Sequence, residues 1–90
     1  MERANIFSVE SGNYIEYWMM TDVANATVTV YDSETGGYVA WARILEGGNR
    51  VNFFRAQSNE YYQYGLKTGT DLYSIYDVES GQYIKYAMKG

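Results

Sequence analysis

The chain has 90 residues and a formal net charge of −4, and it contains neither Cys nor His. This composition excludes a disulfide framework and thiol chemistry, and it removes the commonest general base and metal ligand. The negative charge weighs against nucleic acid as the main ligand, because phosphate binding needs a basic surface. Tyr is the unusual component, since eleven Tyr residues make up most of an aromatic content of 18%.

Eight short segments rich in Val, Ile, Thr, Tyr and Phe follow one another along the chain. Such segments are typical of β-strands, and none has a convincing helical period. The segment 40–45, AWARIL, is also compatible with a helical turn in isolation. The predicted strands cover about 5–9, 13–20, 27–32, 37–45, 50–56, 60–66, 71–77 and 82–88.

The two ends of the chain carry nearly the same nine residues, VESGNYIEY at 9–17 and VESGQYIKY at 78–86. Two further copies lie between them, within YDSETGGYVAW at 31–41 and FRAQSNEYYQY at 54–64. One recurring Tyr per copy, at spacings of 24, 23 and 22 residues, shows that four units fill the chain. We therefore predict a single all-β domain (1–90) of four hairpin units, at about 5–20, 27–45, 50–66 and 71–88.

The middle of each copy reads as a tight turn: Glu-Ser-Gly, Glu-Thr-Gly, Gln-Ser-Asn and Glu-Ser-Gly in chain order. Gly adopts positive φ at the least cost and Asn is its usual substitute, so Asn59 is predicted to be left-handed. Asp32 and Asp77 precede their turns and are predicted to accept backbone N–H bonds there. Each unit is therefore expected to form a β-hairpin.

Short connections make consecutive strands antiparallel neighbours, which predicts an eight-stranded antiparallel meander of four repeated hairpins. Eight strands form either a small barrel, filled by its own side chains, or a barrel-like sandwich. Closure would remove the exposed strand edges.

Two of the copies resemble a known kind of hairpin. VTVYDSETGGYVA and SIYDVESGQYIKY are similar to hairpins common in β-propeller blades and in tyrosine-aspartate repeat proteins. The resemblance covers the turn and its flanks, and the unit is too short for a four-stranded blade.

A four-residue turn would place Tyr76 opposite Tyr83 and Ile75 opposite Ile84, and this register gives each hairpin two faces. One face carries no charge and is the predicted core. It comprises Ile6, Ile15, Tyr17, Val28, Val30, Val39, Trp41, Val51, Phe53, Tyr62, Tyr64, Tyr73, Ile75, Ile84 and Tyr86. A three-residue turn would shift the register by one residue and mix the two faces.

The opposite face combines polar side chains with one aromatic pair per unit. Its polar residues are Glu16, Asn52, Gln63, Ser74 and Lys85. Its aromatic residues are Phe7, Tyr14, Tyr31, Tyr38, Phe54, Tyr61, Tyr76 and Tyr83. Two interpretations stay open: the pairs support the sheet from outside, or they form a binding surface, since Tyr is enriched at interfaces.

No residue pattern indicates catalysis. The carboxylates of Glu10, Glu34 and Glu79 recur with the turns, and neither an acidic metal loop nor an activated nucleophile is evident. We expect no enzyme activity, no catalytic residue, no cofactor and no metal. The sequence favours a binding module that docks a protein partner or self-associates through the aromatic face, for instance as a small inhibitor or adaptor. A carbohydrate-binding module that uses the same aromatic ladder is the alternative, and nucleic acid is disfavoured.

The first residues, MERANIFSVESGN, lack the apolar stretch of a signal peptide. No apolar run approaches the ~18 residues of a membrane helix. These two features favour a cytoplasmic protein without a membrane segment.

Overall fold

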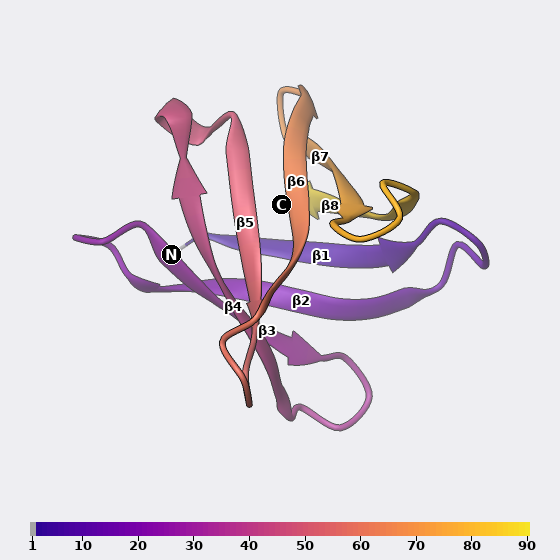
Figure 1. Ribbon diagram of the computed structural model, residues 1–90, viewed down its shortest axis with the longest axis horizontal. Helices are drawn as coiled ribbons and strands as arrows, with labels where there is room; N and C mark the ends of the chain where they lie inside the picture. Colours follow the sequence, from indigo (N-terminus) through magenta and orange to yellow (C-terminus); the bar gives the residue numbers. More distant parts are fainter. Residues whose placement is uncertain (1) are drawn as a thin grey trace.

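The structure, a computed structural model, describes residues 2–90 and is a closed barrel of eight antiparallel strands. The strands follow chain order around the barrel, and β8 closes it by pairing with β1 (Figure 1). They are β1 (Arg3–Ser8), β2 (Tyr14–Asp22), β3 (Thr27–Asp32), β4 (Tyr38–Leu45), β5 (Arg50–Arg55), β6 (Tyr61–Gly69), β7 (Leu72–Asp77) and β8 (Tyr83–Lys89). The predicted all-β meander is confirmed, and residues 40–45 belong to β4. A short 3-10 turn, η1 (Glu46–Gly48), follows β4.

Successive strands run in opposite directions, so the loops collect at two ends of the barrel. The four hairpin turns form one end, which we name the turn end; they lie within residues 8–13, 32–37, 55–60 and 77–82. The three connections between units, at 23–26, 46–49 and 70–71, form the opposite linker end. In Figure 1 the turn end faces right and down, and the linker end faces left and up.

The four turns have the predicted conformation. Asn59 has φ 60° and stands where the other units have Gly at φ 73–75°. The carboxylates of Asp32 and Asp77 accept backbone N–H bonds within their turns, each at 2.8 Å, from Glu34 and Ser80. The bonds from the Ser80 backbone and side chain hold the pKa of Asp77 below its usual value.

Within each hairpin the pairing has one β-bulge just after the turn, at Ile15, Val39, Tyr62 and Ile84 in chain order. In the fourth unit Tyr76 pairs with Tyr83 as predicted, but the next pair is Ile75 with Lys85, which leaves Ile84 as the extra residue. The carbonyl of each bulge residue accepts a bond from the next unit's turn, as from Val9 N–H to Ile84 at 3.0 Å. The bulges therefore connect neighbouring hairpins, and the carbonyl of each bulge residue is paired in doing so.

The bulge moves every later residue of a second strand to the other face, and this corrects the predicted core. First-strand residues are buried as predicted: Ile6, Val28, Val30, Val51, Phe53, Tyr73 and Ile75. The bulge residues Ile15, Val39 and Tyr62 pack partly buried against this core, and Ile84 is half-buried. The prediction is wrong for Tyr17, Trp41, Tyr64 and Tyr86, which lie outside. Their neighbours Trp18, Ala42, Gly65 and Ala87 are buried instead.

One interior position of the repeat holds a single large residue and three small ones: Trp18, Ala42, Gly65 and Ala87. Trp18 is fully buried, and its ring centroid lies 5.5 Å from that of Tyr73 and 6.0 Å from that of Phe53. Its Nε1 is buried and has no hydrogen-bond partner among residues 2–90. The four units share one interior, which is as closely packed as other protein cores. One large side chain there therefore requires small ones at the equivalent positions.

Candidate functional site

The eight predicted surface aromatics lie on the outer wall of the barrel in the predicted pairs. Ring centroids are 5.7–5.8 Å apart in three pairs, and Tyr31 pairs with Tyr38 in the β3–β4 register. The first member of each pair is half-buried, whereas the second is exposed. The exposed fractions are 42% for Tyr14, 54% for Tyr38, 36% for Tyr61 and 45% for Tyr83.

The half-buried members are covered by four aromatics that were predicted to be in the core. Phe7 stacks on Tyr86, Tyr31 on Tyr17, Phe54 on Trp41 and Tyr76 on Tyr64, with centroids 4.3–5.4 Å apart. Each stack joins the second strand of one unit to the first strand of the next. These rings therefore serve the barrel itself, and the large accessible aromatic surface is that of the four exposed tyrosines.

Two arginines hold two of the exposed tyrosines against the wall. The Arg3 guanidinium lies 4.2 Å from the centroid of the Tyr17 ring and donates to the Tyr14 hydroxyl at 3.0 Å. In the third unit Arg50 lies 4.7 Å from the Tyr64 centroid and donates to the Tyr61 hydroxyl at 2.9 Å. The second and fourth units have Thr27 and Leu72 at this position. Their tyrosines are the two more exposed ones.

A cleft lies between each two neighbouring hairpins at the turn end. Each cleft is lined by the exposed tyrosine and the bulge residue of one unit and by turn residues of the next. We name them the Tyr14, Tyr38, Tyr61 and Tyr83 clefts; their volumes lie between about 250 and 440 Å³. The turn residue at one equivalent position is Glu34, Gln57, Glu79 and Glu10, respectively.

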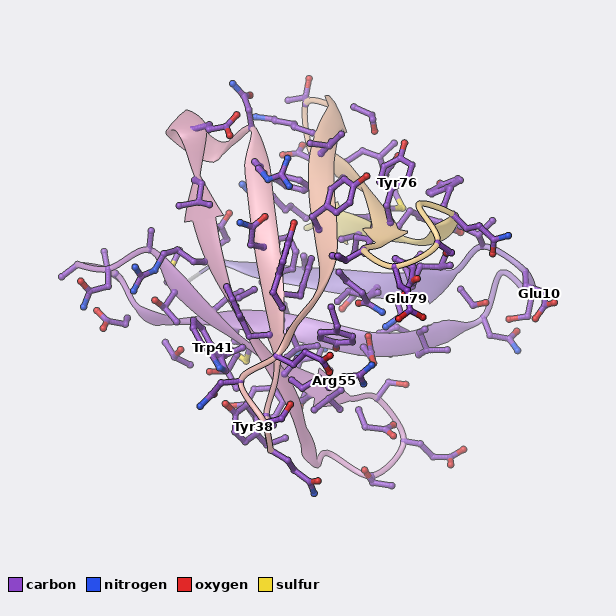
Figure 2. The ribbon with its side chains drawn as sticks, in the orientation of Figure 1. Glu10, Tyr38, Trp41, Arg55, Tyr76 and Glu79 are labelled. Carbon is purple, nitrogen blue, oxygen red and sulfur yellow. The ribbon has the colours of Figure 1, made fainter. Side chains whose placement is uncertain are left out.

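The charge of the molecule is concentrated at this end. The four turn segments hold six of the eleven acidic residues and one of the seven basic residues, a net charge of −5. The rest of the chain therefore has a net charge of +1. Glu10 and Glu79 extend from two of these turns in Figure 2, which also labels Arg55, the one basic turn residue. The turn end is thus both aromatic and acidic.

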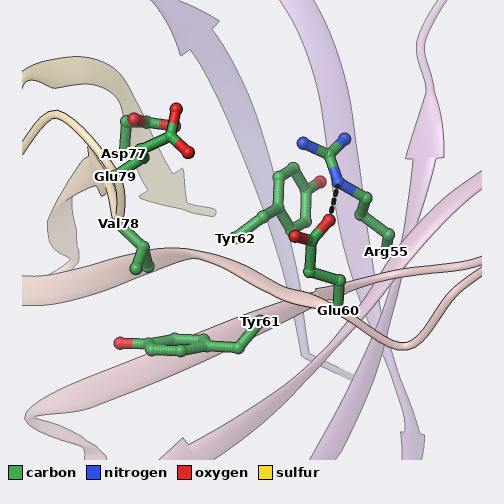
Figure 3. Close-up of a pocket in the computed structure, with 7 residues that line it drawn as sticks. All are labelled: Arg55, Glu60, Tyr61, Tyr62, Asp77, Val78 and Glu79. Carbon is green, nitrogen blue, oxygen red and sulfur yellow. Dashed lines mark hydrogen bonds and ion pairs between the residues drawn. The ribbon is translucent and has the colours of Figure 1, made fainter.

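The Tyr61 cleft shows how this surface accommodates a cation (Figure 3). Arg55 lies with its guanidinium 4.4 Å from the centroid of the Tyr62 ring and donates to Glu60 at 2.9 Å. Asp77, Val78 and Glu79 line the opposite side of the cleft. The chain thus places one of its own arginines between an aromatic face and a carboxylate, which is a favourable arrangement for a guanidinium.

Three side chains predicted on the outer face lie instead inside the mouth of the barrel at the turn end. Lys85 Nζ donates to Glu16 Oε1 at 2.9 Å and to Gln63 Oε1 at 3.4 Å. The side chains of Lys85 and Glu16 are 15% and 14% exposed, and Gln63 is buried. The bulge explains this correction as well, because these residues follow it directly. Burial and the nearby Glu16 carboxylate raise the pKa of the neighbouring Tyr62 to about 12.

Within residues 2–90 no group of three or more acidic side chains is arranged to hold a metal ion. None of the described elements is a helix with the length and apolar character needed to cross a membrane. Comparison with protein-family models, curated proteins and solved structures gives no match to this chain.

We call Arg3 and Arg50, each with the tyrosines that it contacts, the two arginine clamps. Sequence reasoning missed them, although the sequence contains their signal. The first strand reads RANIF at 3–7 in the first unit and RVNFF at 50–54 in the third. In both, Arg Nε donates to the Asn two residues later, at 3.3 Å from Arg3 and 2.9 Å from Arg50. The units therefore form two alternating kinds, a twofold pattern within the fourfold one.

Proposed function

We propose that the protein is a non-enzymatic binding module that docks a protein partner on its turn end. The observation that carries this proposal is the fourfold set of clefts, each lined by an exposed tyrosine and by the next turn. Tyr offers a large rigid contact area and a hydrogen-bonding tip, which is why it is enriched at protein interfaces. The other aromatic residues of the outer wall pack on one another and contribute less accessible surface.

The experiment compares partner capture by three forms of the protein. One is the natural chain, and the second carries Tyr38→Ala and Tyr61→Ala, which removes aromatic surface from two clefts. The third carries Val23→Ser and Met88→Ser, which removes exposed apolar surface elsewhere; these residues are 81% and 50% exposed. We expect a protein retained by the natural chain and by the control, and lost from the tyrosine variant. Equal retention by all three forms would refute the proposal.

A second copy of the chain is one such protein partner, and light scattering over a concentration series identifies it. If the turn end self-associates, the natural chain gains mass with concentration and the tyrosine variant stays monomeric. In that case the captured protein is the chain itself, and the module acts by assembling.

A carbohydrate-binding module is the second candidate, since the clefts place a tyrosine near turn carboxylates and amides, groups that stack on sugar rings and bind hydroxyls. Trp41 reports on this surface, because its indole Nε1 donates to Asn59 in the β5–β6 turn at 2.9 Å. Quenching of its fluorescence by an oligosaccharide, lost with Tyr38→Ala, would favour this candidate over a protein partner.

A further inference from the structure

We infer that the partner presents an arginine-rich segment, and that its guanidinium groups enter the Tyr14, Tyr61 and Tyr83 clefts. This inference rests on the proposed function and specifies the chemistry of the partner. The first ground is charge complementarity: the turn end has a net charge of −5, whereas the remainder of the molecule has +1. A cationic segment is therefore attracted to this end and oriented toward it during association.

The second ground is the position of three arginines of the chain itself on tyrosine rings. Arg3, Arg50 and Arg55 each lie over a tyrosine ring, 4.2–4.7 Å from its centroid. Arg55 does so at the turn end itself, where it also forms an ion pair with Glu60. Guanidinium suits such places better than ammonium, because it is planar, weakly hydrated and donates in a fixed fork. The surface should therefore prefer arginine to lysine.

The four clefts differ in the side chains that would meet this charge. Glu34, Glu79 and Glu10 line the Tyr14, Tyr61 and Tyr83 clefts. Arg55 lines both the Tyr38 and the Tyr61 clefts, but the Tyr61 cleft also has Asp77 beside Glu79. The Tyr38 cleft has Gln57 instead, and its one carboxylate, Glu16, is already paired with Lys85. Three clefts are therefore suited to a cation and the fourth is not. Several weak contacts on one surface favour a segment with several arginines over a single one.

The test measures the affinity of a labelled nine-arginine peptide by fluorescence anisotropy, with nine-lysine and Gly/Ser peptides as comparisons. In Glu10→Gln/Glu34→Gln/Glu79→Gln we expect the arginine peptide to bind about tenfold more weakly, since exposed charge pairs contribute modestly and three are removed. The matched control, Glu2→Gln/Glu46→Gln/Asp71→Asn, removes the same charge at the linker end and should change affinity less than about twofold.

A second pair of variants tests the clefts without changing charge. Tyr83 lines an acidic cleft and Tyr38 lines the one that has Gln57, and neither unit has the arginine clamp. Tyr83→Ser should weaken binding of the arginine peptide about threefold, whereas Tyr38→Ser should leave it unchanged. The lysine peptide should bind several-fold more weakly than the arginine peptide to the natural chain.

Two outcomes would overturn the inference: no binding of the arginine peptide at low salt, or an equal loss in the linker-end control. The second outcome would mean that the peptide is attracted by the net charge of the protein alone. If capture by the natural chain still depends on Tyr38 and Tyr61, only the cationic partner is wrong and the binding module stands. If that capture also fails to depend on them, the proposed function fails as well.

Discussion

The four units are alike on the outer wall of this barrel and differ in its interior. Outside, each unit carries the same turn, the same bulge and an exposed tyrosine, and each is stacked on the next in the same way. Inside, one equivalent position holds Trp18, Ala42, Gly65 and Ala87, and another holds Glu16, Ala40, Gln63 and Lys85. The repeat is thus kept at the turns and on the outer wall, and it is lost in the interior that all four units share.

This difference follows from how space is shared. A turn or an outer stack involves one unit and its neighbour, so four copies can be identical. The interior of an eight-stranded barrel is one volume, and four identical large side chains would overfill it while four small ones would leave a cavity. The fourfold symmetry of the chain must therefore be broken inside.

The largest expected effect comes from emptying part of this shared interior. Trp18→Ala should destabilise the barrel by about 3–5 kcal/mol, the usual loss for a large buried aromatic. A domain of this length is stable by on the order of 5–13 kcal/mol, so the variant should be close to unfolding. Urea unfolding followed by circular dichroism measures the change.

The matching rescue moves the large residue to an equivalent position of another unit. Trp18→Ala/Ala42→Trp restores the summed volume and should be more stable than Trp18→Ala alone. If the double variant is less stable than the single one, the interior depends on the particular site of Trp18 rather than on the total volume.

The second prediction breaks the polar set in the barrel mouth. Lys85→Met leaves the mostly buried Glu16 carboxylate without its ion pair and should cost about 1–3 kcal/mol, less than for a fully buried pair. Glu16→Gln/Lys85→Met removes both charges and should recover most of that loss. Equal stability of the two variants in urea unfolding would show that the ion pair has no such role.

The third prediction addresses Tyr62, which stands where the other units have Ile or Val. Its folded pKa is about 12, above the ordinary value of 10.0. The unfolded chain loses this proton first, so stability should fall as pH rises from about 10 to about 12. Burial also raises the pKa of Tyr73. Phenolate absorbance should therefore show a late-titrating component that loses one tyrosine in Tyr62→Phe and keeps Tyr73. Complete titration of all tyrosines near the ordinary value, with the fold intact, would contradict this.

The fourth prediction tests whether the hairpin turns of the four units are equivalent. Gly12→Ala, Gly36→Ala and Gly81→Ala each place a side chain at positive φ and should each cost about 1 kcal/mol. Because the turns are equivalent, the three losses should agree within about 0.5 kcal/mol. Asn59→Gly should be neutral. Thermal unfolding of the four variants provides the comparison, and widely different losses would mean that the turns are not equivalent.

The smallest effect concerns Gly65, one of the three small interior residues. A Cβ there would meet Ile75 at 3.5 Å and Phe53 at 3.6 Å, which is ordinary contact. Gly65→Ala should therefore stabilise the strand by about 0.5 kcal/mol, since Gly is unfavourable within a strand. Gly65→Val should overpack the interior and cost about 1–3 kcal/mol. Shifts of the urea midpoint in opposite directions for the two variants would support a limited interior volume shared by the four units.

The sequence was sufficient for the features that each unit carries by itself. Strand positions, the antiparallel meander, the left-handed Asn59 and the turn bonds of Asp32 and Asp77 all follow from short-range patterns and are present. The four aromatic pairs were also assigned to the outer face. Local rules of strand and turn chemistry were enough for all of these.

The bulge could not be predicted, because its reason lies in another unit. The Ile84 carbonyl is satisfied by Val9, which is remote in the chain, and nothing local to residues 82–86 signals the extra residue. That one-residue shift exchanged Tyr86 for Ala87 and brought Lys85 inward. It also made the clefts invisible from the sequence, since each is built from two units.

Closure between β1 and β8 also has a kinetic consequence. Each hairpin pairs neighbours in the chain and can form within roughly 1–10 μs, whereas pairing Ala4 with Lys89 requires the two ends of the chain to meet. Until then both strands expose unpaired N–H and C=O groups, which are templates for pairing with other molecules. During refolding, aggregation should therefore compete with ring closure rather than with hairpin formation.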